Sequence, residues 1–582
     1  MPWAVCSSIE ICTVICFIFL SSITRSFLPA SILASGARAG KADRSGSLRA
    51  RAKATLNENF AKIITMKRAL AILLMAAVLI SLRLVRLNAD PPLSFPNGFR
   101  AIEPFTDEAA KAFQARNRAL FGVWNTNAKD EYRFWKVLSP VWCYPLMVWF
   151  KGFGVSYASL RLFSVFWFSL GMFLVYFSLR KSPGAAAPGF ALFFYGVNFY
   201  LLLFSRLGLM ETMLNSFLLL TFFLLASSQK QKWIFPIALL AWLSAYFIKQ
   251  NALLLSPMVM VGYFLVFSLP WRKKFWASPA NWVSVLCAAL CIWLLWHLWH
   301  EPVYRLYTVL NLRHGYGLPP AAGGLTLRPD MMKASMLYHL GWRGLWDNFF
   351  AYDPLAAVLA IFDLLLVIWL LVRRREVFGP EILAGVWLLS VQVLMLFSSA
   401  RVVRFWLIQI PAMVILAGAG LARIQKLLAG RGKIKFTVAA LLLFLSFEYN
   451  FHFWLDWQRN ARCQVAENSA RLESALAGKK AVVVGKWAGP LLLPSRHQYY
   501  YLKHIFNRKP EQLQSFGITH ILLGDVPSLV RDKFELSNDP YQQSVRAAFP
   551  LAFERKKPVL TFPFYDGELT LYELEPASPG SP

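Results

Sequence analysis

Long apolar segments alternate with short polar connections along most of the chain. Apolar runs of about 17 to 22 residues recur from Met66 to Trp454, and each is long enough to cross a hydrocarbon core about 30 Å thick. The pattern therefore predicts an α-helical polytopic membrane protein with about 11 transmembrane helices. We expect the spans at 68–87, 158–178, 186–204, 212–227, 233–248, 251–269, 281–299, 352–372, 381–399, 405–422 and 436–454.

The pattern changes after the last apolar span. Residues 456–582 alternate short apolar runs such as KAVVVG and THILLGD with polar helical stretches such as NSARLESALAG. Runs of this length and spacing predict strands and helices of a small α/β domain. The segment VLTFPFYDGELTLYELE predicts a terminal hairpin that turns at Asp566 and Gly567, because Asp-Gly favours a tight turn between strands.

Residues 1–65 do not fit either part. An apolar stretch at 11–20 precedes Ser, Gly, Ala and Arg, which is consistent with a crude signal sequence. The alternative is an N-terminal extension, disordered or an artefact of the gene model, with Met66 as the natural start. MKRALAILLMAAVLISL from Met66 alone supplies a good first signal anchor, so we favour the extension and assign the transmembrane domain to 66–455.

Composition and charge agree with a membrane protein. The 582 residues are 57% hydrophobic and 16% charged, with a formal net charge of +30. Nucleic-acid binding would not require basic residues at every second connection between spans, whereas the positive-inside rule does. The amino end is then cytoplasmic and the C-terminal domain extracytoplasmic. The cytoplasmic basic groups are Lys67 and Arg68, Arg180 and Lys181, Lys230 and Lys232, Arg272 to Lys274, Arg373 to Arg375, and Arg423 to Lys435.

The first long outer loop, 88–157, carries an adjacent acid pair, Asp107 and Glu108. One interpretation is structural: Thr106 caps a helix whose first turn holds both acids, near the positive end of the helix dipole. That helix would lie along the membrane surface. The other interpretation is catalytic, with a carboxylate serving as a base. Periodicity alone does not decide between them.

Other ionisable residues occupy the outer turns. Arg206 and Glu211 lie at one junction of two spans, Lys249 at a second, and Arg401 and Arg404 at a third. Each has a structural alternative: Arg206 could pair with Glu211, and the cations could extend toward lipid headgroups. Ionisable groups at such sites are costly and usually functional. Two carboxylate sites and several phosphate-binding cations would together suit a lipid-linked anionic phosphate.

No resident cofactor is expected. His297, His300 and Glu301 have the residue types of a metal cluster, but their place at the outer end of an aromatic helix favours an interfacial role. The sequence contains no phosphate-cradling glycine loop and no nucleotide fingerprint. The site residues include no metal ligand set, although the sequence leaves a divalent metal open.

Several motifs together carry a family resemblance, strongest between Pro104 and Pro257. In order they are the DE pair, SPVWCYPLMVWFKGFGVSYASLRLFS, SRLGLMETML, FIKQNALLLSP and RVVRFWLIQIPAMVILAG. This order resembles glycosyltransferase family 39 and its relatives in the GT-C superfamily: the protein O-mannosyltransferases, the lipid A aminoarabinose transferases and the RgtA/B/C/D-like enzymes. The resemblance implies a GT-C type membrane fold. It also implies Asp107 as catalytic base with Glu108 beside it, and Lys249 and Arg404 near the lipid phosphate. The second acid of the family is often Asp, and here it is Glu211.

We therefore expect a glycosyltransferase of the bacterial inner membrane. Its donor would be a polyprenyl-phosphate-linked sugar, and its acceptor a hydroxyl of an extracytoplasmic lipid, glycan or protein. Asp107 would accept the hydroxyl proton, and Lys249, Arg404, Arg401 and Arg206 would stabilise the departing phosphate. Membrane lipids would surround the helices. The alternatives are a transporter or flippase for a lipid-linked sugar and a non-catalytic membrane scaffold.

Overall fold

The structure is a computed structural model of the whole chain. It describes residues 69–95, 102–267, 279–298, 340–396, 403–500, 513–527, 540–550 and 557–574, with isolated gaps inside these ranges and single residues near 66 and 336. The expectations for residues 1–65, for most of the loop 300–350 and for Arg401 fall outside the described residues.

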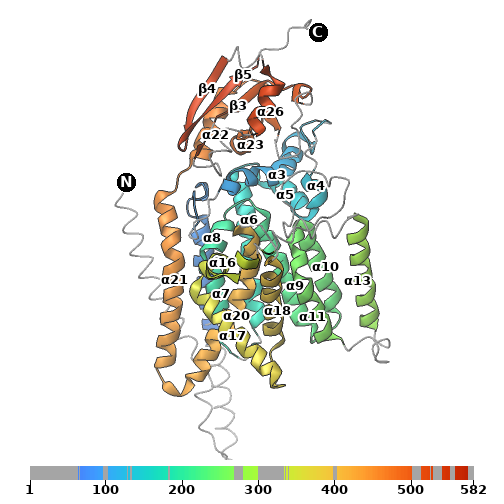
Figure 1. Cartoon of the computed structure of the whole chain (residues 1–582), viewed down its shortest axis with the longest axis vertical. Helices are drawn as coiled ribbons and strands as arrows, with labels where there is room; N and C mark the ends of the chain where they lie inside the picture. The colour runs from blue at the N-terminus through green and yellow to red at the C-terminus, as the bar shows by residue number, and fades with distance from the viewer. Residues whose placement is uncertain are drawn as a thin grey trace, which may run out of the picture.

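A bundle of long helices forms the larger part of the molecule, and a small mixed sheet lies at one end of it (Figure 1). We call this end of the bundle the domain end. The first helix of the bundle is Ala69–Leu84. The others are α6 (Tyr157–Leu179), α7 (Ala187–Val197), α8 (Phe199–Phe204), α9 (Met210–Ser228), α10 (Ile234–Ile248), η2 (Gln250–Leu255), α11 (Ser256–Val266), α13 (Pro279–Leu298), α17 (Pro354–Val372), α18 (Gly379–Met395), α19 (Val403–Trp406), η4 (Leu407–Gln409), α20 (Ile410–Leu427) and α21 (Ile434–Asn460).

Every predicted span coincides with one helix or with two or three consecutive helices. Among the described residues, five helices are long and apolar enough to cross a membrane by length and composition: Tyr157–Leu179, Met210–Ser228, Pro354–Val372, Val403–Leu427 and Ile434–Ala475. The prediction of a helical membrane protein is confirmed, while the number of crossings stays a prediction. The span predicted at 186–204 is interrupted at Asn198, whose side chain caps α8 by accepting from the Leu201 amide.

Helix α20 lies at the centre of the bundle and packs against α7 and α17. Two glycines allow the close approach. A Cβ atom at Gly418 would lie 2.6 Å from the backbone nitrogen of Ala191, and one at Gly420 would lie 2.7 Å from the carbonyl oxygen of Leu359. The helix is therefore held by backbone contact on two sides. The two elements that precede it, α19 and η4, are continuous with it, so Arg404 on α19 has a defined position.

Buried charges in the bundle are paired with opposite charges or hydrogen-bonded to neutral groups, which offsets the cost of desolvation. Asp353 caps α17 by accepting from the Ala356 amide. Asp363 lies inside α17, and its Oδ1 is 2.9 Å from Nε of Arg423 on α20. Arg423 also pairs with Glu381 on α18.

The C-terminal domain contains a five-stranded sheet of order β2-β1-β3-β5-β4. Strand β1 pairs in parallel with β2 and β3, whereas β5 is antiparallel to β3 and β4. The predicted terminal hairpin is β4 and β5, with Phe564 opposite Gly567 across the turn. An α/β domain is therefore confirmed. Its elements are α22 (Gln464–Ala475), β1 (Val482–Val484), α23 (Ala488–Leu492), β2 (Gln498–Tyr500), β3 (His520–Leu523), α26 (Pro540–Ala548), β4 (Lys557–Phe564) and β5 (Gly567–Glu573).

Helix α3 (Ile102–Phe121), which carries the acid pair, lies between the bundle and the C-terminal domain (Figure 1). It packs against α5 (Pro140–Phe153) and α23. Its residues from Asp107 to Asn117 are buried, including Arg116. The helix is therefore packed inside the protein, and its lying along the membrane surface stays a prediction. Arg116 is satisfied by backbone carbonyls from a part of the chain that follows more than 370 residues later.

The contact made by Arg116 is a dense set of hydrogen bonds. Its guanidinium donates to the carbonyl oxygens of Leu493 (2.8 Å), Leu492 (3.1 Å), Ser495 (2.7 Å) and His497 (2.8 Å). These acceptors follow or end α23 in the C-terminal domain. Hydrogen bonds from a charged donor are stronger than neutral ones, so Arg116 fixes the C-terminal domain to the helix that holds Asp107.

Candidate active site

Four charged side chains from four separate segments meet at the domain end of the bundle. Arg404 forms an ion pair with Asp107. Lys249 forms a second with Glu211, at 2.5 Å between Nζ and Oε1, and Nε of Arg404 lies 3.9 Å from the same oxygen. The two carboxylates and two cations are thus one connected cluster with no formal net charge. We call these residues the four-charge cluster.

Local backbone structure positions each member. Asp107 lies in the second turn of α3, and Glu211 in the first turn of α9. Lys249 follows the last residue of α10 with an extended backbone (φ −157°, ψ 133°), so the chain turns there before η2 begins. Arg404 lies in the short helix α19, just before η4 and α20. Helix ends and turns therefore supply three of the four groups.

The four-charge cluster is largely buried, but its cations remain partly accessible. Glu211 is 1% exposed and Asp107 is 6% exposed, whereas the side chains of Lys249 and Arg404 retain 15% and 11%. The ring of Phe405 lies beside both cations, with its centroid 4.8 Å from Nζ of Lys249 and 5.6 Å from Cζ of Arg404. The cations are therefore the more accessible half of the four-charge cluster, and an aromatic face supports them.

Lys111 is a further cation close to the cluster. It lies one helical turn after Asp107 on α3 and interacts electrostatically with Glu211. Its Nζ lies 3.7 Å from the ring centroid of Trp135. The sequence held a signal for this residue, because positions four apart share one face of a helix.

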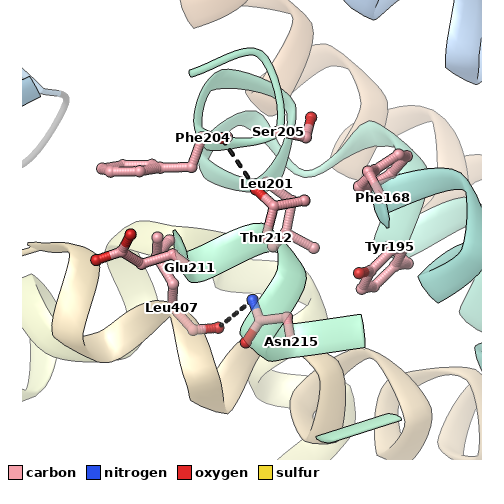
Figure 2. Close-up of a pocket in the computed structure, with 9 residues that line it drawn as sticks. All are labelled: Phe168, Tyr195, Leu201, Phe204, Ser205, Glu211, Thr212, Asn215 and Leu407. Atoms are coloured by element: carbon pink, nitrogen blue, oxygen red, sulfur yellow. Dashed lines mark hydrogen bonds between the residues drawn. The ribbon is translucent and has the colours of Figure 1, made fainter. Parts of the chain in front are cut away.

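A small cavity lies on the inner side of Glu211 (Figure 2). Its volume is about 10 Å³, which is about enough for one water molecule. Polar groups of Tyr195, Ser205, Thr212 and Asn215 line it together with apolar side chains. Asn215 lies one turn after Glu211 and donates to the carbonyl oxygen of Leu407 at 3.4 Å, which ties α9 to the segment that follows Arg404.

Glu108 faces a different partner from its neighbour Asp107. Its carboxylate makes a bidentate ion pair with Arg161 on α6, at 3.0 Å from Nε and 2.7 Å from Nη2. It also accepts the backbone amide of Gly208 at 2.6 Å. Arg161 in turn donates to the carbonyl oxygens of Leu87 and Ala89. Arg161 was not singled out from the sequence, because an arginine near the start of an apolar span has no local signature of such a pair.

Gly208 belongs to the SRLGL motif and allows this contact. A Cβ atom at this position would overlap the side chain of Leu160. The glycine therefore lets the turn between α8 and α9 approach α6 closely enough for its amide to reach Glu108. The same turn leads directly to Glu211 at the start of α9.

Arg206 does not join the four-charge cluster. Its Nη2 donates to the carbonyl oxygen of Arg86, and its guanidinium carbon lies 4.5 Å from the ring centroid of Trp457 on α21. The structural alternative in which Arg206 pairs with Glu211 is not what the structure shows, because Glu211 is paired with Lys249 and Arg404. The structure brings Asp107, Glu211, Lys249 and Arg404 together and places Arg206 elsewhere.

The capping interpretation of the acid pair is wrong. Helix α3 begins at Ile102, so Thr106 lies inside the helix and the acids follow its first turn. An N-cap must precede the first helical residue, which excludes Thr106 from that role. Both carboxylates instead meet arginines from distant segments.

No group of three His, Cys, Asp or Glu side chains with metal-binding geometry occurs among the described residues. The carboxylates of Asp107 and Glu211 already face cations.

The helical bundle, the buried charged cluster at one end and the α/β domain over it define the class of the protein as a helical membrane protein with a small C-terminal domain. No protein-family model matches the chain, and no curated protein matches it in sequence. Among solved structures, the chain is similar to ArnT from Cupriavidus metallidurans in the apo state, with a TM-score of 0.53 and 13% identity over 86% of this chain and 97% of that one. It is also similar to the same ArnT bound to undecaprenyl phosphate, with a TM-score of 0.52 and 14% identity over 88% and 99%. The predicted GT-C fold is thereby confirmed.

Proposed function

We propose that the protein is a membrane glycosyltransferase that moves a sugar from a polyprenyl-phosphate donor to an acceptor hydroxyl. The observation that carries the proposal is the convergence of Asp107, Glu211, Lys249 and Arg404 at one end of the bundle. This set offers a base for the hydroxyl and cations for the phosphate. A likeness in fold to an ArnT that binds undecaprenyl phosphate supports a lipid-linked donor.

Asp107 acts as the base. A hydroxyl is a weak nucleophile until a carboxylate within hydrogen-bond reach accepts its proton during attack. The acceptor oxygen forms a bond to the anomeric carbon while the bond from that carbon to the phosphate oxygen breaks. The proton goes to Asp107 and the electron pair leaves with the polyprenyl phosphate. One displacement of this kind inverts the anomeric configuration.

Lys249 and Arg404 hold the phosphate. The leaving group is a stable anion, so cations at the departing oxygen stabilise it and no general acid is required. Both cations are engaged by carboxylates in the free protein, and both are partly accessible. A donor phosphate draws Arg404 away from Asp107, which frees that carboxylate for the acceptor hydroxyl. Glu211 remains with Lys249 and keeps it in position.

Glu108 supports the site without touching the reacting atoms. Its bidentate pair with Arg161 fixes α3 against α6, and this orientation directs the adjacent Asp107 toward Arg404. Arg401, which precedes α19, stays a proposed donor contact.

The positive-inside pattern places the four-charge cluster on the extracytoplasmic side of a bacterial inner membrane, with the amino end in the cytoplasm. Nucleotide sugars are absent from that side, so a sugar carried on a lipid is the consistent donor. The acceptor is a lipid, a glycan or a protein with a free hydroxyl. A flippase for the same lipid would use the phosphate-binding cations but would not require a carboxylate placed to accept a hydroxyl proton, and a scaffold would require neither.

The test is complementation of a deletion strain, read by mass analysis of its cell-envelope glycans. Wild type restores the missing sugar, which identifies the sugar and its attachment point. Asp107→Asn, inserted at a normal level, fails to restore it, whereas Glu467→Gln in the exposed part of α22 restores it. Full restoration by Asp107→Asn would remove Asp107 from the mechanism.

Transfer is then measured in detergent-solubilised protein with the identified donor and acceptor. A transferase attaches the labelled sugar to the acceptor without any membrane to cross. A flippase leaves it on the polyprenyl phosphate. Loss of the base lowers kcat by about 10²–10⁴-fold.

A further inference from the structure

A second, larger cavity lies where the bundle meets the C-terminal domain. Its volume is about 470 Å³, which is within the range of about 300–1,000 Å³ that is usual for small-molecule sites. Four segments form its walls: residues 90–95 after the first helix, Phe199 at the start of α8, the last turns of α21 with the connection to α22, and Tyr565 at the tip of the terminal hairpin. We call it the junction cavity.

One carboxylate in the junction cavity is incompletely satisfied. Asp90 is 2% exposed, and its Oδ2 accepts from the hydroxyl of Tyr565 at 2.7 Å and from the amide of Gln464 at 2.8 Å. Its Oδ1 is buried and has no hydrogen-bond partner among the described residues. A buried acceptor without a partner costs about 1–3 kcal/mol. Asp90 lines the cavity, so a small shift of its side chain would bring this unpartnered oxygen within reach of a donor on a ligand.

Much of the remaining lining is aromatic, and we call it the aromatic wall. Phe95, Phe199, Phe453 and Trp457 line the junction cavity. The indole of Trp457 is held in place because its Nε1 donates to the carbonyl oxygen of Asp90 at 3.0 Å and Arg206 lies against its ring. Exposed polar groups of Asp456, Asn460 and Arg462 complete the lining at the end of α21.

The combination of a buried carboxylate, aromatic side chains and exposed polar groups favours a carbohydrate over a phosphate or an acyl chain. Two carboxylates against a single lining guanidinium disfavour a phosphate. An acyl chain would leave the Asp90 carboxylate unsatisfied. A sugar ring suits both the aromatic wall and the polar groups: its C–H face packs on the electron-rich face of an aromatic ring, and its hydroxyls donate to carboxylate and amide oxygens and accept from a guanidinium.

We propose that the junction cavity is a carbohydrate-binding site that holds a pyranose unit between the aromatic wall and the Asp90 carboxylate. The sugar belongs either to the acceptor glycan or to the lipid-linked donor. The site is joined to the four-charge cluster by Arg161, which contacts the backbone of Leu87 and Ala89 just before Asp90 and the carboxylate of Glu108 beside Asp107. Binding there does not depend on the proposed transfer.

The experiment measures saturation-transfer difference NMR of methyl glycopyranosides with the full chain in lipid nanodiscs. The methyl glucosides, galactosides and mannosides are tested one at a time at millimolar concentration. At least one gives ring-proton signals with the wild type. Ser94→Trp, a change at an exposed residue of the cavity lining, fills the opening and abolishes these signals, whereas Ser94→Ala keeps them.

A second pair of variants tests the aromatic wall. Phe453→Leu removes a ring that lines the cavity and weakens the signals, while Phe444→Leu makes the same change at an exposed position of the same helix and leaves them intact. Asp107→Asn and Arg404→Ala keep the signals, which separates this site from the proposed transfer reaction.

A polyprenyl-phosphate-linked sugar, with sugar-free undecaprenyl phosphate as its control, distinguishes the sources of the sugar. If the sugar-carrying lipid displaces the glycoside and undecaprenyl phosphate does not, the cavity holds the sugar of the donor lipid; if neither displaces it, the cavity holds acceptor glycan. Absence of a signal for every glycoside with the wild type would overturn the proposal, as would an equal signal with Ser94→Trp.

Discussion

Arg404 and Asp107 are separated by 297 positions in the chain, yet they form an ion pair at the domain end of the bundle. The pair joins two parts of the protein. Arg404 precedes α20, whose close backbone contacts hold it at the centre of the bundle, and Asp107 lies on α3, which is hydrogen-bonded to the C-terminal domain. Arg404 also lies within 3.9 Å of Glu211. This one guanidinium therefore connects both candidate catalytic carboxylates.

Arg404→Ala is expected to weaken donor binding. A charge-assisted hydrogen bond contributes about 1.5–3 kcal/mol, so its loss should raise the dissociation constant for undecaprenyl phosphate by about 10- to 100-fold. Arg404→Lys keeps the charge but not the forked geometry and should give an intermediate value. Titration of the nanodisc-embedded protein measures the affinity. Arg373→Ala, an exposed arginine at the end of α17, is the control, and an unchanged affinity with Arg404→Ala would exclude Arg404 as a phosphate ligand.

Glu108→Gln is expected to destabilise the fold. The change leaves Arg161 buried without a charged partner, and breaking a buried pair in this way costs about 3–5 kcal/mol. Denaturant unfolding of the purified protein measures the loss. The paired change Glu108→Leu with Arg161→Met removes both charges and should recover a large part of it. If Glu108→Gln were as stable as wild type but inactive, Glu108 would act on substrate rather than on Arg161.

Gly208→Ala is expected to disturb the turn that presents Glu211, because the added methyl group would overlap Leu160. The amide of residue 208 would move away from Glu108, and the stability and the transfer rate should both fall. Overpacking of this kind costs about 1–3 kcal/mol. Leu160→Ala introduced together with Gly208→Ala makes room for the methyl group. The midpoint of thermal unfolding is measured for both variants. A higher midpoint in the double variant than in Gly208→Ala would support the steric explanation, and an equal midpoint would contradict it.

Arg116→Ala is expected to loosen the C-terminal domain from α3. Four backbone carbonyls lose a charged donor, and each left buried without a partner costs about 1–3 kcal/mol. Hydrogen exchange at residues 488–497 should accelerate, and transfer should fall because α3 is less constrained. Arg118→Ala, at an exposed residue of the same helix, should change neither. Unchanged exchange with Arg116→Ala would show that other contacts dock the domain.

The connection between Asp90 and the C-terminal domain should depend on pH. Burial raises the pKa of Asp90 from 3.8 to about 6, although hydrogen bonds from Tyr565 and backbone amides oppose that shift. The folded protein therefore binds the proton more tightly than the unfolded chain, so stability falls as the pH rises from about 4 to 6 and is constant above that window. The total effect is at most about 3 kcal/mol.

Hydrogen exchange of the Gln464 and Val465 amides, corrected for the intrinsic rate, measures this dependence. Protection should be greater at pH 5 than at pH 7.5. Asp90→Asn, which cannot ionise, should remove the difference, and the same pH dependence in that variant would assign it to another group.

The sequence predicted the helices and the terminal hairpin well because their signals are local. Apolar runs of sufficient length predict spans, and Asp566 followed by Gly567 predicts the turn. The role of Thr106 was predicted wrongly because the start of α3 lies four residues earlier, and helix boundaries are weakly encoded.

The candidate site was accessible to sequence reasoning only in part. Asp107, Glu211, Lys249 and Arg404 could be selected because charge is rare at the ends of apolar spans. Their pairing could not, since it depends on how distant helices pack. Arg116 and Arg161 illustrate the same limit: each is buried by groups from remote segments, and a buried arginine looks the same in sequence as an exposed one.

The hydrogen bonds from Arg116 on α3 to backbone carbonyls of the C-terminal domain have a consequence for biosynthesis. Asp107 is made early, but the residues that clamp its helix, from Leu492 to His497, are made after every membrane helix. A ribosome that stops before this point releases a chain with all its spans and an unfixed acid helix. We therefore expect incomplete chains to lack the proposed transfer activity until the C-terminal domain has been synthesised and has docked.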